Sequence, residues 1–228
     1  MKVQADRMHF KKLNSLIRET GDRQVTIDSC TGQRYIASAL AGKDIVINGT
    51  PGNALGCYLN GCTIHVYGNT QEATGDTMNS GKIYVHGSCG DATGYAMRGG
   101  KIFIKGDVGY RVGIHMKAYM SKYPVIVVGG KAGDFLGEYM AGGAILLLGM
   151  FTDKPYAPIC GRSLGTGMHG GAMYLRCDKK PENLAVQVSA RKCGDKDMKE
   201  IEEYIERYCQ YFEMEPEQVL SGPFYKLT

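Results

Sequence analysis

The side chains of this 228-residue sequence that could do chemistry are its cysteines, histidines, serines and carboxylates. The eight cysteines include no C-x-x-C pair and no cysteine–histidine spacing of a zinc site. Because a free cysteine behaves as a small apolar side chain, we expect buried thiols in a reducing compartment. The cysteines are Cys30, Cys57, Cys62, Cys89, Cys160, Cys177, Cys193 and Cys209, and the histidines are His9, His65, His86, His115 and His169.

Patterns for nucleophilic or acid–base catalysis are also missing. The nearest approach to a serine nucleophile motif is the GRSLG run at Gly161–Gly165, but Ser163 occupies a repeat position that is alanine at Ala54, Ala73 and Ala92. No glycine loop opens a helix to hold a nucleotide. The aspartates scatter over glycine corners: Asp44, Asp76, Asp91, Asp107 and Asp134. The sequence therefore predicts no catalytic, cofactor-binding or metal-binding residue in this chain.

A repeat of about 19 residues positions most of these side chains. Each unit carries a glycine, and three residues later a leucine or methionine. Each also carries a pair of apolar residues in strand-like alternation. The glycines are Gly56, Gly75, Gly94, Gly113, Gly137 and Gly165, the first four spaced by 19, and they are followed by Leu59, Met78, Met97, Met116, Met140 and Met168. The pairs are Ile45/Ile47, Ile64/Val66, Ile83/Val85, Ile102/Ile104, Val125/Val127 and Ile145/Leu147.

This unit is too short and too rich in glycine for the two helices of an α-solenoid repeat. Strand and glycine corner in alternation predict an all-β protein, a single-stranded parallel β-helix of about seven coils with two apolar ladders inside. We expect one structural domain in three parts: a cap segment at residues 1–23, the β-helix at 24–178, and a C-terminal helix and tail packed on it at 179–228.

Amphipathic patterns predict a helix near each end of the chain. The N-terminal one is a candidate cap that covers the strand edges of the first coil. The C-terminal one runs from about residue 197 to 212, with Asp197 and Glu200 as a capping box. The apolar stripes are Phe10, Leu13 and Ile17 in the first helix, and Met198, Ile201, Ile205, Tyr208 and Phe212 in the second.

The residues between the inward pairs form an outward column that is apolar or aromatic at six of seven positions. A solvated face is mostly polar, so something covers this one. Either the chain's own C-terminal helix or a partner protein fits. The candidate partner interface is His65, Tyr84, Phe103, Ile126, Leu146 and Tyr174, and Val46 completes the column.

Two insertions interrupt the repeat, at about residues 117–124 and 150–160. Insertions in a solenoid become surface loops, often where it binds something. Both tolerated loops and a ligand site fit the sequence. A deep polar pocket near Lys154 or Arg162 would favour the ligand site.

The composition argues against nucleic acid and membranes as partners. The net charge is +4, and no dense Lys/Arg patch is interleaved with aromatic residues, so we expect no nucleic acid. No apolar run reaches 18 residues and the N-terminus lacks a hydrophobic signal core. We therefore expect a cytoplasmic protein without membrane contact.

The succession of corners carries a family resemblance. The runs GDATGYAMRGGKIFIKGDVGYRVGIHM and GDFLGEYMAGGAILLLG resemble the GXGXG-motif domain at the C-terminus of the glutamate synthase large subunit, which is a right-handed parallel β-helix. The likeness covers roughly residues 25 to 228. A related domain, similar in its repeats, occurs in formylmethanofuran dehydrogenase. The C-terminal run ARKCGDKDMKEIEEYIERYCQYF and the ending GPFYKL favour the glutamate synthase branch.

The resemblance implies a non-catalytic scaffold subunit of a split glutamate synthase, an oxidoreductase complex of glutamate biosynthesis and nitrogen metabolism. This chain would hold the glutaminase (amidotransferase) and FMN synthase chains together. FMN and an iron–sulfur cluster would belong to those partners, with no cofactor on this chain. The alternatives are a scaffold like the GXGXG-bearing component of formylmethanofuran dehydrogenase, and a homo-oligomeric or ligand-binding β-helix protein.

Overall fold

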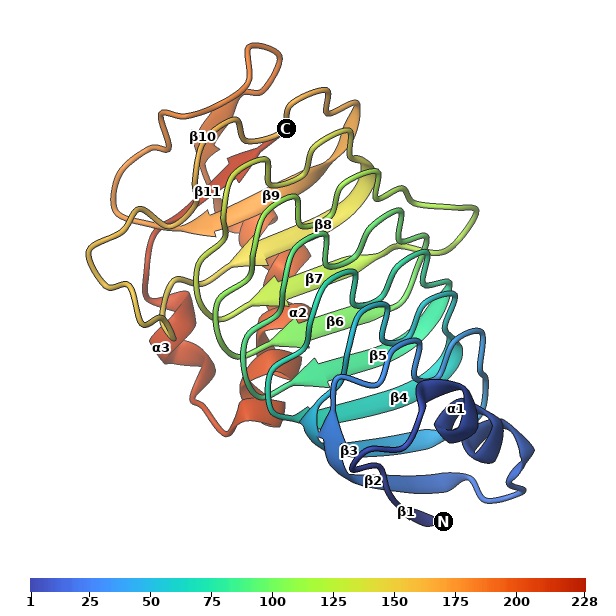
Figure 1. The fold of residues 1–228 in the computed structure, drawn as a ribbon. Coiled ribbons are helices and arrows are strands. Elements are labelled where there is room, and N and C mark those ends of the chain that lie inside the picture. The colour runs from blue at the N-terminus through green and yellow to red at the C-terminus, as the bar shows by residue number, and fades with distance from the viewer.

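The computed structural model describes residues 1–228. One large, mostly parallel sheet of 11 strands dominates it, in the order β1-β2-β3-β4-β5-β6-β7-β8-β9-β11-β10 (Figure 1). The strands are β1 (Lys2–Gln4), β2 (Gln24–Thr31), β3 (Asp44–Thr50), β4 (Asn60–Tyr67), β5 (Ser80–Val85), β6 (Lys101–Ile104), β7 (Val125–Val128), β8 (Ala141–Leu147), β9 (Gly170–Arg176), β10 (Ala190–Lys192) and β11 (Phe224–Leu227). The helices are α1 (Phe10–Glu19), α2 (Asp195–Phe212) and α3 (Pro216–Leu220). The prediction of a mainly β protein with a parallel sheet and few helices is confirmed.

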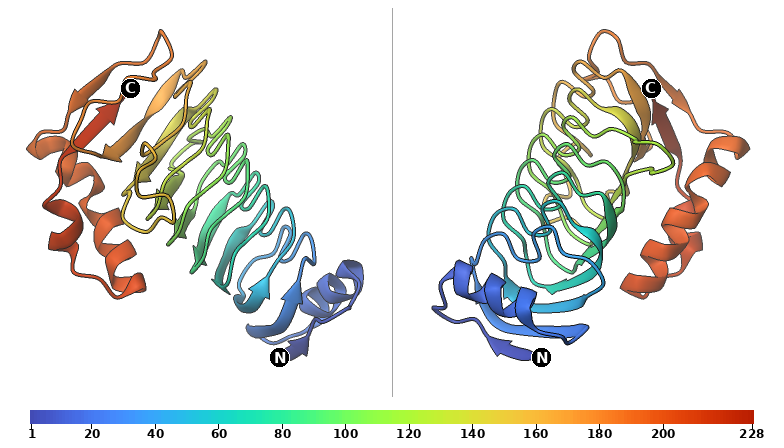
Figure 2. Two further views of the ribbon diagram at one scale, coloured as in Figure 1. Left: turned by 60° about the vertical axis from the view of Figure 1, so that its left-hand side comes forward. Right: turned by 90° about the vertical axis from the view of Figure 1, so that its right-hand side faces the viewer.

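Successive repeat units stack in register. Ile64 pairs with Ile83 and Ile83 with Ile102, so residues 19 apart in the sequence lie side by side. The pairing continues through the glycine corners, where the Gly94 N–H donates to the Thr74 carbonyl over 2.7 Å. Figure 2 shows the units stacked along one axis, from α1 to the C-terminal segment. Hydrogen bonds between neighbouring units therefore satisfy backbone groups on all sides of the stack.

The two predicted ladders fill the interior. The isoleucine and valine pairs from β3 to β6 and the Leu/Met residues are buried in one continuous core. Gly94 shows why glycine recurs opposite them, because its φ is +72° and an added Cβ would lie 2.4 Å from Ile126 Cδ1. Both the backbone conformation and the packing demand a residue without a side chain at this corner.

The predicted register is wrong by one residue in β7. Ile126 pairs with Ile102 and Ile145 in the inner ladder, whereas Val127 pairs with Phe103 and Leu146 on the outward face. All four residues of β7 are apolar and buried, so alternation could not distinguish the two faces. Ile126 therefore does not belong to the outward column.

Helix α1 lies over the first units of the stack, and Leu13 and Ile17 enter the core as predicted. The N-terminal segment also adds β1, which pairs in parallel with β2 at the edge of the sheet. The sequence pattern did not indicate this short strand. A three-residue edge strand leaves few unpaired backbone groups for other chains to pair with.

Helix α2 lies along the outside of the sheet and covers several strands (Figure 2). It begins at Asp195, two residues before the predicted start, with Gly194 as its N-cap. The Asp197 carboxylate accepts the Gly194 N–H over 3.0 Å, so Asp197 takes the role that was predicted for Glu200. None of the helices is both long enough and apolar enough to cross a membrane.

Candidate functional site

The chain's own C-terminal segment covers the outward column from Tyr84 to Tyr174. Tyr84, Phe103, Leu146 and Tyr174 are at most 6% exposed, in a second core with Ile201, Ile205, Tyr208 and Phe212 of α2. The sequence predicts that either the C-terminal helix or a partner protein covers this face, and in the structure the C-terminal helix does so. These four residues, placed in the candidate partner interface, lie under α2. His65, in β4, is half-buried and lies next to Tyr211 near the C-terminal end of α2.

The end of α2 is fixed by a tyrosine between two histidines. The Tyr211 hydroxyl lies 2.6 Å from His65 Nδ1 and 3.1 Å from His86 Nε2, so it can donate to one ring and accept from the other. Its ring also stacks on Tyr84, with centroids 3.9 Å apart. Burial lowers the pKa of both histidines, so the neutral rings are favoured here. Tyr211 is 125 or more residues from either histidine, which is why the sequence pattern missed the cluster.

The start of α2 is fixed by an ionic cluster. Asp197 accepts two hydrogen bonds from the Arg191 guanidinium, the longer 2.7 Å, and one of 3.1 Å from Lys226 Nζ. These bonds, led by Arg191, hold the pKa of Asp197 well below its usual range. Glu200 accepts from the Tyr174 hydroxyl and from Lys226, each over 2.6 Å. The cluster therefore fastens α2 to both β9 and β11.

The aspartates at the corners bridge neighbouring units. Asp91 accepts the Tyr110 N–H over 2.8 Å and Asp107 accepts the Lys131 N–H over 2.7 Å. Asp134 accepts the Arg162 N–H over 2.8 Å in the same way. Each of the three follows a glycine directly, a signal that could have predicted this role. These carboxylates therefore stabilise the stack at its corners.

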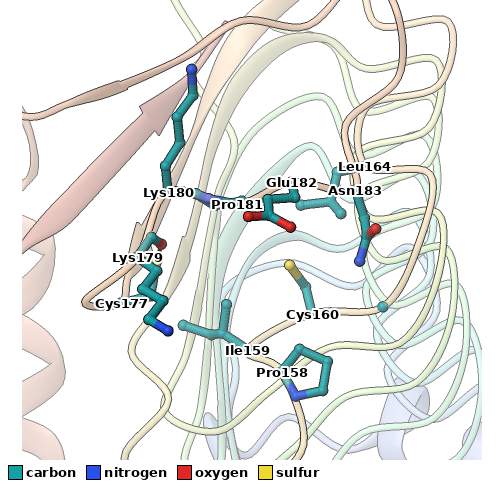
Figure 3. Close-up of a pocket in the computed structure, with 11 residues that line it drawn as sticks. Pro158, Ile159, Cys160, Leu164, Cys177, Lys179, Lys180, Pro181, Glu182 and Asn183 are labelled. Atoms are coloured by element: carbon teal, nitrogen blue, oxygen red, sulfur yellow. Dashed lines mark hydrogen bonds between the residues drawn. The ribbon is translucent and has the colours of Figure 1, made fainter.

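The second insertion is tied to the stack. The Lys131 ammonium donates to the carbonyls of Lys154 (2.6 Å), Pro155 (3.0 Å) and Ala157. The Thr152 hydroxyl donates to Asp107 over 2.9 Å. An open groove of about 450 Å³ lies between this loop and the segment from Cys177 to Asn183. Figure 3 shows Cys160 directed into the groove and Lys180 directed away from it.

The groove is not equipped with a reactive thiol. Burial raises the pKa of Cys160 to about 12 and that of Cys177 to about 11, so both are protonated at neutral pH.

The other candidate residues also lack the surroundings of a catalytic or metal site. The side chain of Arg162 is 81% exposed and lies 3.5 Å from Asp134. Ser163 is at a corner with φ +60°, in the position of Ala54 and Ala92. No three His, Cys, Asp or Glu side chains gather in a way that could hold a metal ion.

The first insertion forms a short hairpin beside α2. Tyr119 and Lys122 form an antiparallel bridge, and Met120 at the tip is 87% exposed. Tyr123 borders a small, mostly apolar groove of about 230 Å³ against Ile201 and Tyr204 of α2. Both insertions present apolar side chains to solvent, Met120 in this loop and Tyr156 in the second insertion.

Comparison with known proteins places the chain in a family. The GXGXG motif model matches residues 12–226. A Methanocaldococcus jannaschii protein described as "Uncharacterized protein MJ1350" is 45% identical over 225 residues, covering 95% of this chain and 86% of the relative. A chain of the formyltransferase/hydrolase complex FhcABCD from Methylorubrum extorquens, solved with methylofuran, has a similar fold. It is 22% identical with a TM-score of 0.67, and the match covers 90% of this chain and 72% of that chain. The protein described here belongs to the GXGXG motif family.

Proposed function

We propose that this chain is a non-catalytic scaffold subunit that holds the catalytic chains of a multi-subunit enzyme in place. The observation that carries the proposal is how its reactive side chains are used. Corner carboxylates accept N–H groups of the next unit, and the Lys131 ammonium is surrounded by carbonyl oxygens. The Cys160 and Cys177 thiols, beside the groove at the second insertion, are protonated at neutral pH. These groups stabilise the stack and its loops.

We further infer that the stack is a right-handed parallel β-helix. All pairings from β2 to β9 are parallel and follow the chain order. Parallel crossover connections are right-handed in about 98% of cases. A hydrogen-bonded stack with a close-packed apolar core resists deformation, which suits a spacer between catalytic subunits.

Two enzymes are candidates for the complex. The structural similarity to a chain of FhcABCD favours a formylmethanofuran-type complex, in which this chain would serve as the GXGXG-bearing scaffold. The C-terminal run from Ala190 to Phe212 and the ending GPFYKL favour a split glutamate synthase. In that second candidate, amidotransferase and FMN synthase chains would be the partners, and FMN and the iron–sulfur cluster would reside in them.

Purification of the native complex through a tag on this chain tests the proposal. We expect catalytic chains to co-purify, and mass spectrometry to identify them. Molybdopterin- or tungstopterin-binding chains would indicate the formylmethanofuran-type complex, whereas a glutaminase chain and flavin absorbance would indicate glutamate synthase. Recovery of the chain alone, at a multiple of its own mass, would contradict the scaffold role.

A further inference from the structure

We propose that one exposed corner of the stack docks an acidic segment of a partner protein. This corner, the turn face, consists of the aromatic residues Tyr95, His115 and Tyr139, the cations Arg98 and Lys117, and the hairpin at residues 118–123. The inference rests on the proposed scaffold function and names the surface through which it acts.

The aromatic rings of the turn face form an ordered ladder across three units. The Tyr95 and His115 ring centroids are 5.9 Å apart, and the His115 and Tyr139 rings stack at 5.1 Å with an interplanar angle of 9°. Tyr95 is 40% exposed and Tyr139 is 46% exposed. The Tyr139 ring lies over Gly167, where an added Cβ would come within 2.3 Å of it. Rigid, exposed tyrosines offer large contact area with little loss of side-chain entropy on binding.

The ladder carries large rings at positions where the backbone favours glycine. His115 and Tyr139 have φ values of +55° and +51°, a conformation that glycine adopts with less strain. Bulky residues there cost about 1 kcal/mol or more each. Gly167 occupies the next unit at the same repeat position, with φ +67°. Tyr58 occupies the same repeat position with φ +55°, so it is the cations beside the rings, and not the backbone, that distinguish the turn face.

The hairpin extends this apolar surface. It follows Lys117 directly and folds back toward Gly99, where an added Cβ would lie 2.9 Å from Lys122 Cβ. Tyr119 is 53% exposed and Met120 is 87% exposed. Tyrosine, methionine and arginine are among the residue types enriched in protein interfaces. The same corner thus presents all three.

Charge identifies the chemistry of the partner. Arg98, Lys117 and Lys122 form no ion pair within the chain. The acid on the ladder, Glu138, pairs with Arg111 over 3.0 Å. Three uncompensated cations beside exposed aromatic rings fit a segment rich in Asp and Glu. A neutral or basic segment would leave these charges unmatched.

Site-specific photo-crosslinking in the native complex tests the proposal. A photoreactive phenylalanine replaces Tyr139 in one tagged chain and Tyr58 in another. Tyr58 is a matched control, since it is 54% exposed with φ +55° at the same repeat position, but asparagines replace the cations beside it, at Asn60 and Asn79. We expect crosslinks from position 139, and not from 58, to an Asp/Glu-rich peptide of a co-purified protein.

Other outcomes overturn the inference. Crosslinks from both positions or neither, to a second copy of this chain, or to a peptide without acidic residues would each contradict it. If partners co-purify but crosslink elsewhere, the docking surface is wrong and the scaffold role stands. If no chain co-purifies, the scaffold role itself fails and the inference falls with it.

Variants add a quantitative test that does not depend on the crosslinker. Tyr139→Gly removes the ring and relieves the backbone, so the chain keeps its stability. We expect it to weaken binding to the recovered partner about thirtyfold, equivalent to a hot-spot loss of ~2 kcal/mol. Tyr58→Gly should leave binding unchanged. Equal affinities for the two variants would contradict the proposal.

Discussion

Two aromatic ladders occur on different sides of the same stack, and only one of them is covered. On the sheet face, the outward column that lies beneath α2, the rings of His65, Tyr84 and Phe103 stack with centroids 5.1 Å apart. On the turn face, His115 and Tyr139 stack at the same distance of 5.1 Å. The repeat alone therefore produces stacking, because it places equivalent residues of successive units side by side.

The difference lies in what covers each ladder. Helix α2 buries Tyr84 and Phe103 to 6% exposure or less, whereas Tyr139 on the turn face stays 46% exposed. The sheet face thus contributes to the stability of the chain, and the turn face is available to other proteins. The following predictions would break or sharpen this contrast.

The largest effect is expected on the sheet face. Phe103→Ala empties a fully buried site beneath α2 and should lower the free energy of unfolding by about 3 to 5 kcal/mol. Urea denaturation followed by circular dichroism measures it. The matched change Tyr95→Ala on the turn face should stay within about 0.5 kcal/mol of wild type. Equal losses in the two variants would remove the contrast.

A substitution in the core of the stack should be nearly as harmful. Gly94→Ala adds backbone strain and pushes a methyl group against Ile126, for a combined loss of about 2 to 4 kcal/mol. Gly42→Ala is the control, because Gly42 has a similar φ of +69° with nothing within 4 Å of an added Cβ. Its loss should be limited to strain, about 1 kcal/mol. Similar midpoints of denaturation would show that packing at this corner contributes little.

The ionic cluster at the start of α2 should contribute less. Asp197→Asn removes the charge that Arg191 and Lys226 share and should lower the free energy of unfolding by about 2 kcal/mol. The pKa of Asp197 is depressed in the folded chain, so its contribution is present above about pH 4 and is lost as the pH falls further. Thermal melts at pH 7 and pH 3 should therefore differ less in the variant than in wild type.

The histidine pair at the end of α2 should give the smallest effect. Folding favours the neutral form of these two rings, whereas it favours the charged form of Asp197. Burial lowers the pKa of His65 and His86, so the unfolded chain binds more protons and stability falls as the pH drops below about 6.5. Burial is the largest influence on both rings. Asp44 partly offsets it by raising the pKa of His65, while Lys105 lowers and Glu213 raises the pKa of His86. Replacing both histidines by Gln should flatten melting temperature between pH 8 and pH 5.5. His169→Gln, at an exposed position, should leave that slope unchanged.

Much of the fold can be predicted from the sequence, because the repeat fixes the spacing between equivalent residues and the side of the strand on which each side chain lies. The Ile83 and Ile102 rows, the Leu/Met ladder and α2 follow directly from period and alternation. Ile126 was misplaced because β7 is apolar on both faces and follows an insertion. The predicted boundaries near residues 23 and 178 and the cytoplasmic location stay predictions.

The candidate surfaces were harder to predict for a physical reason. Sequence pattern shows that a face is apolar, but not which distant segment covers it, so α2 and a partner were equally good covers. The turn-face ladder joins Tyr95, His115 and Tyr139, and Tyr95 sits one repeat position before the other two. Only the folded corner brings these three rings together.

Hydrogen–deuterium exchange of the chain alone and in its native complex tests the central contrast most directly. The account predicts slower exchange in the complex for amides in residues 92–98, 111–122 and 135–139, with α2 and the strands beneath it unchanged. Protection confined to α2 and the sheet face, with the turn face exchanging as in the free chain, would contradict it.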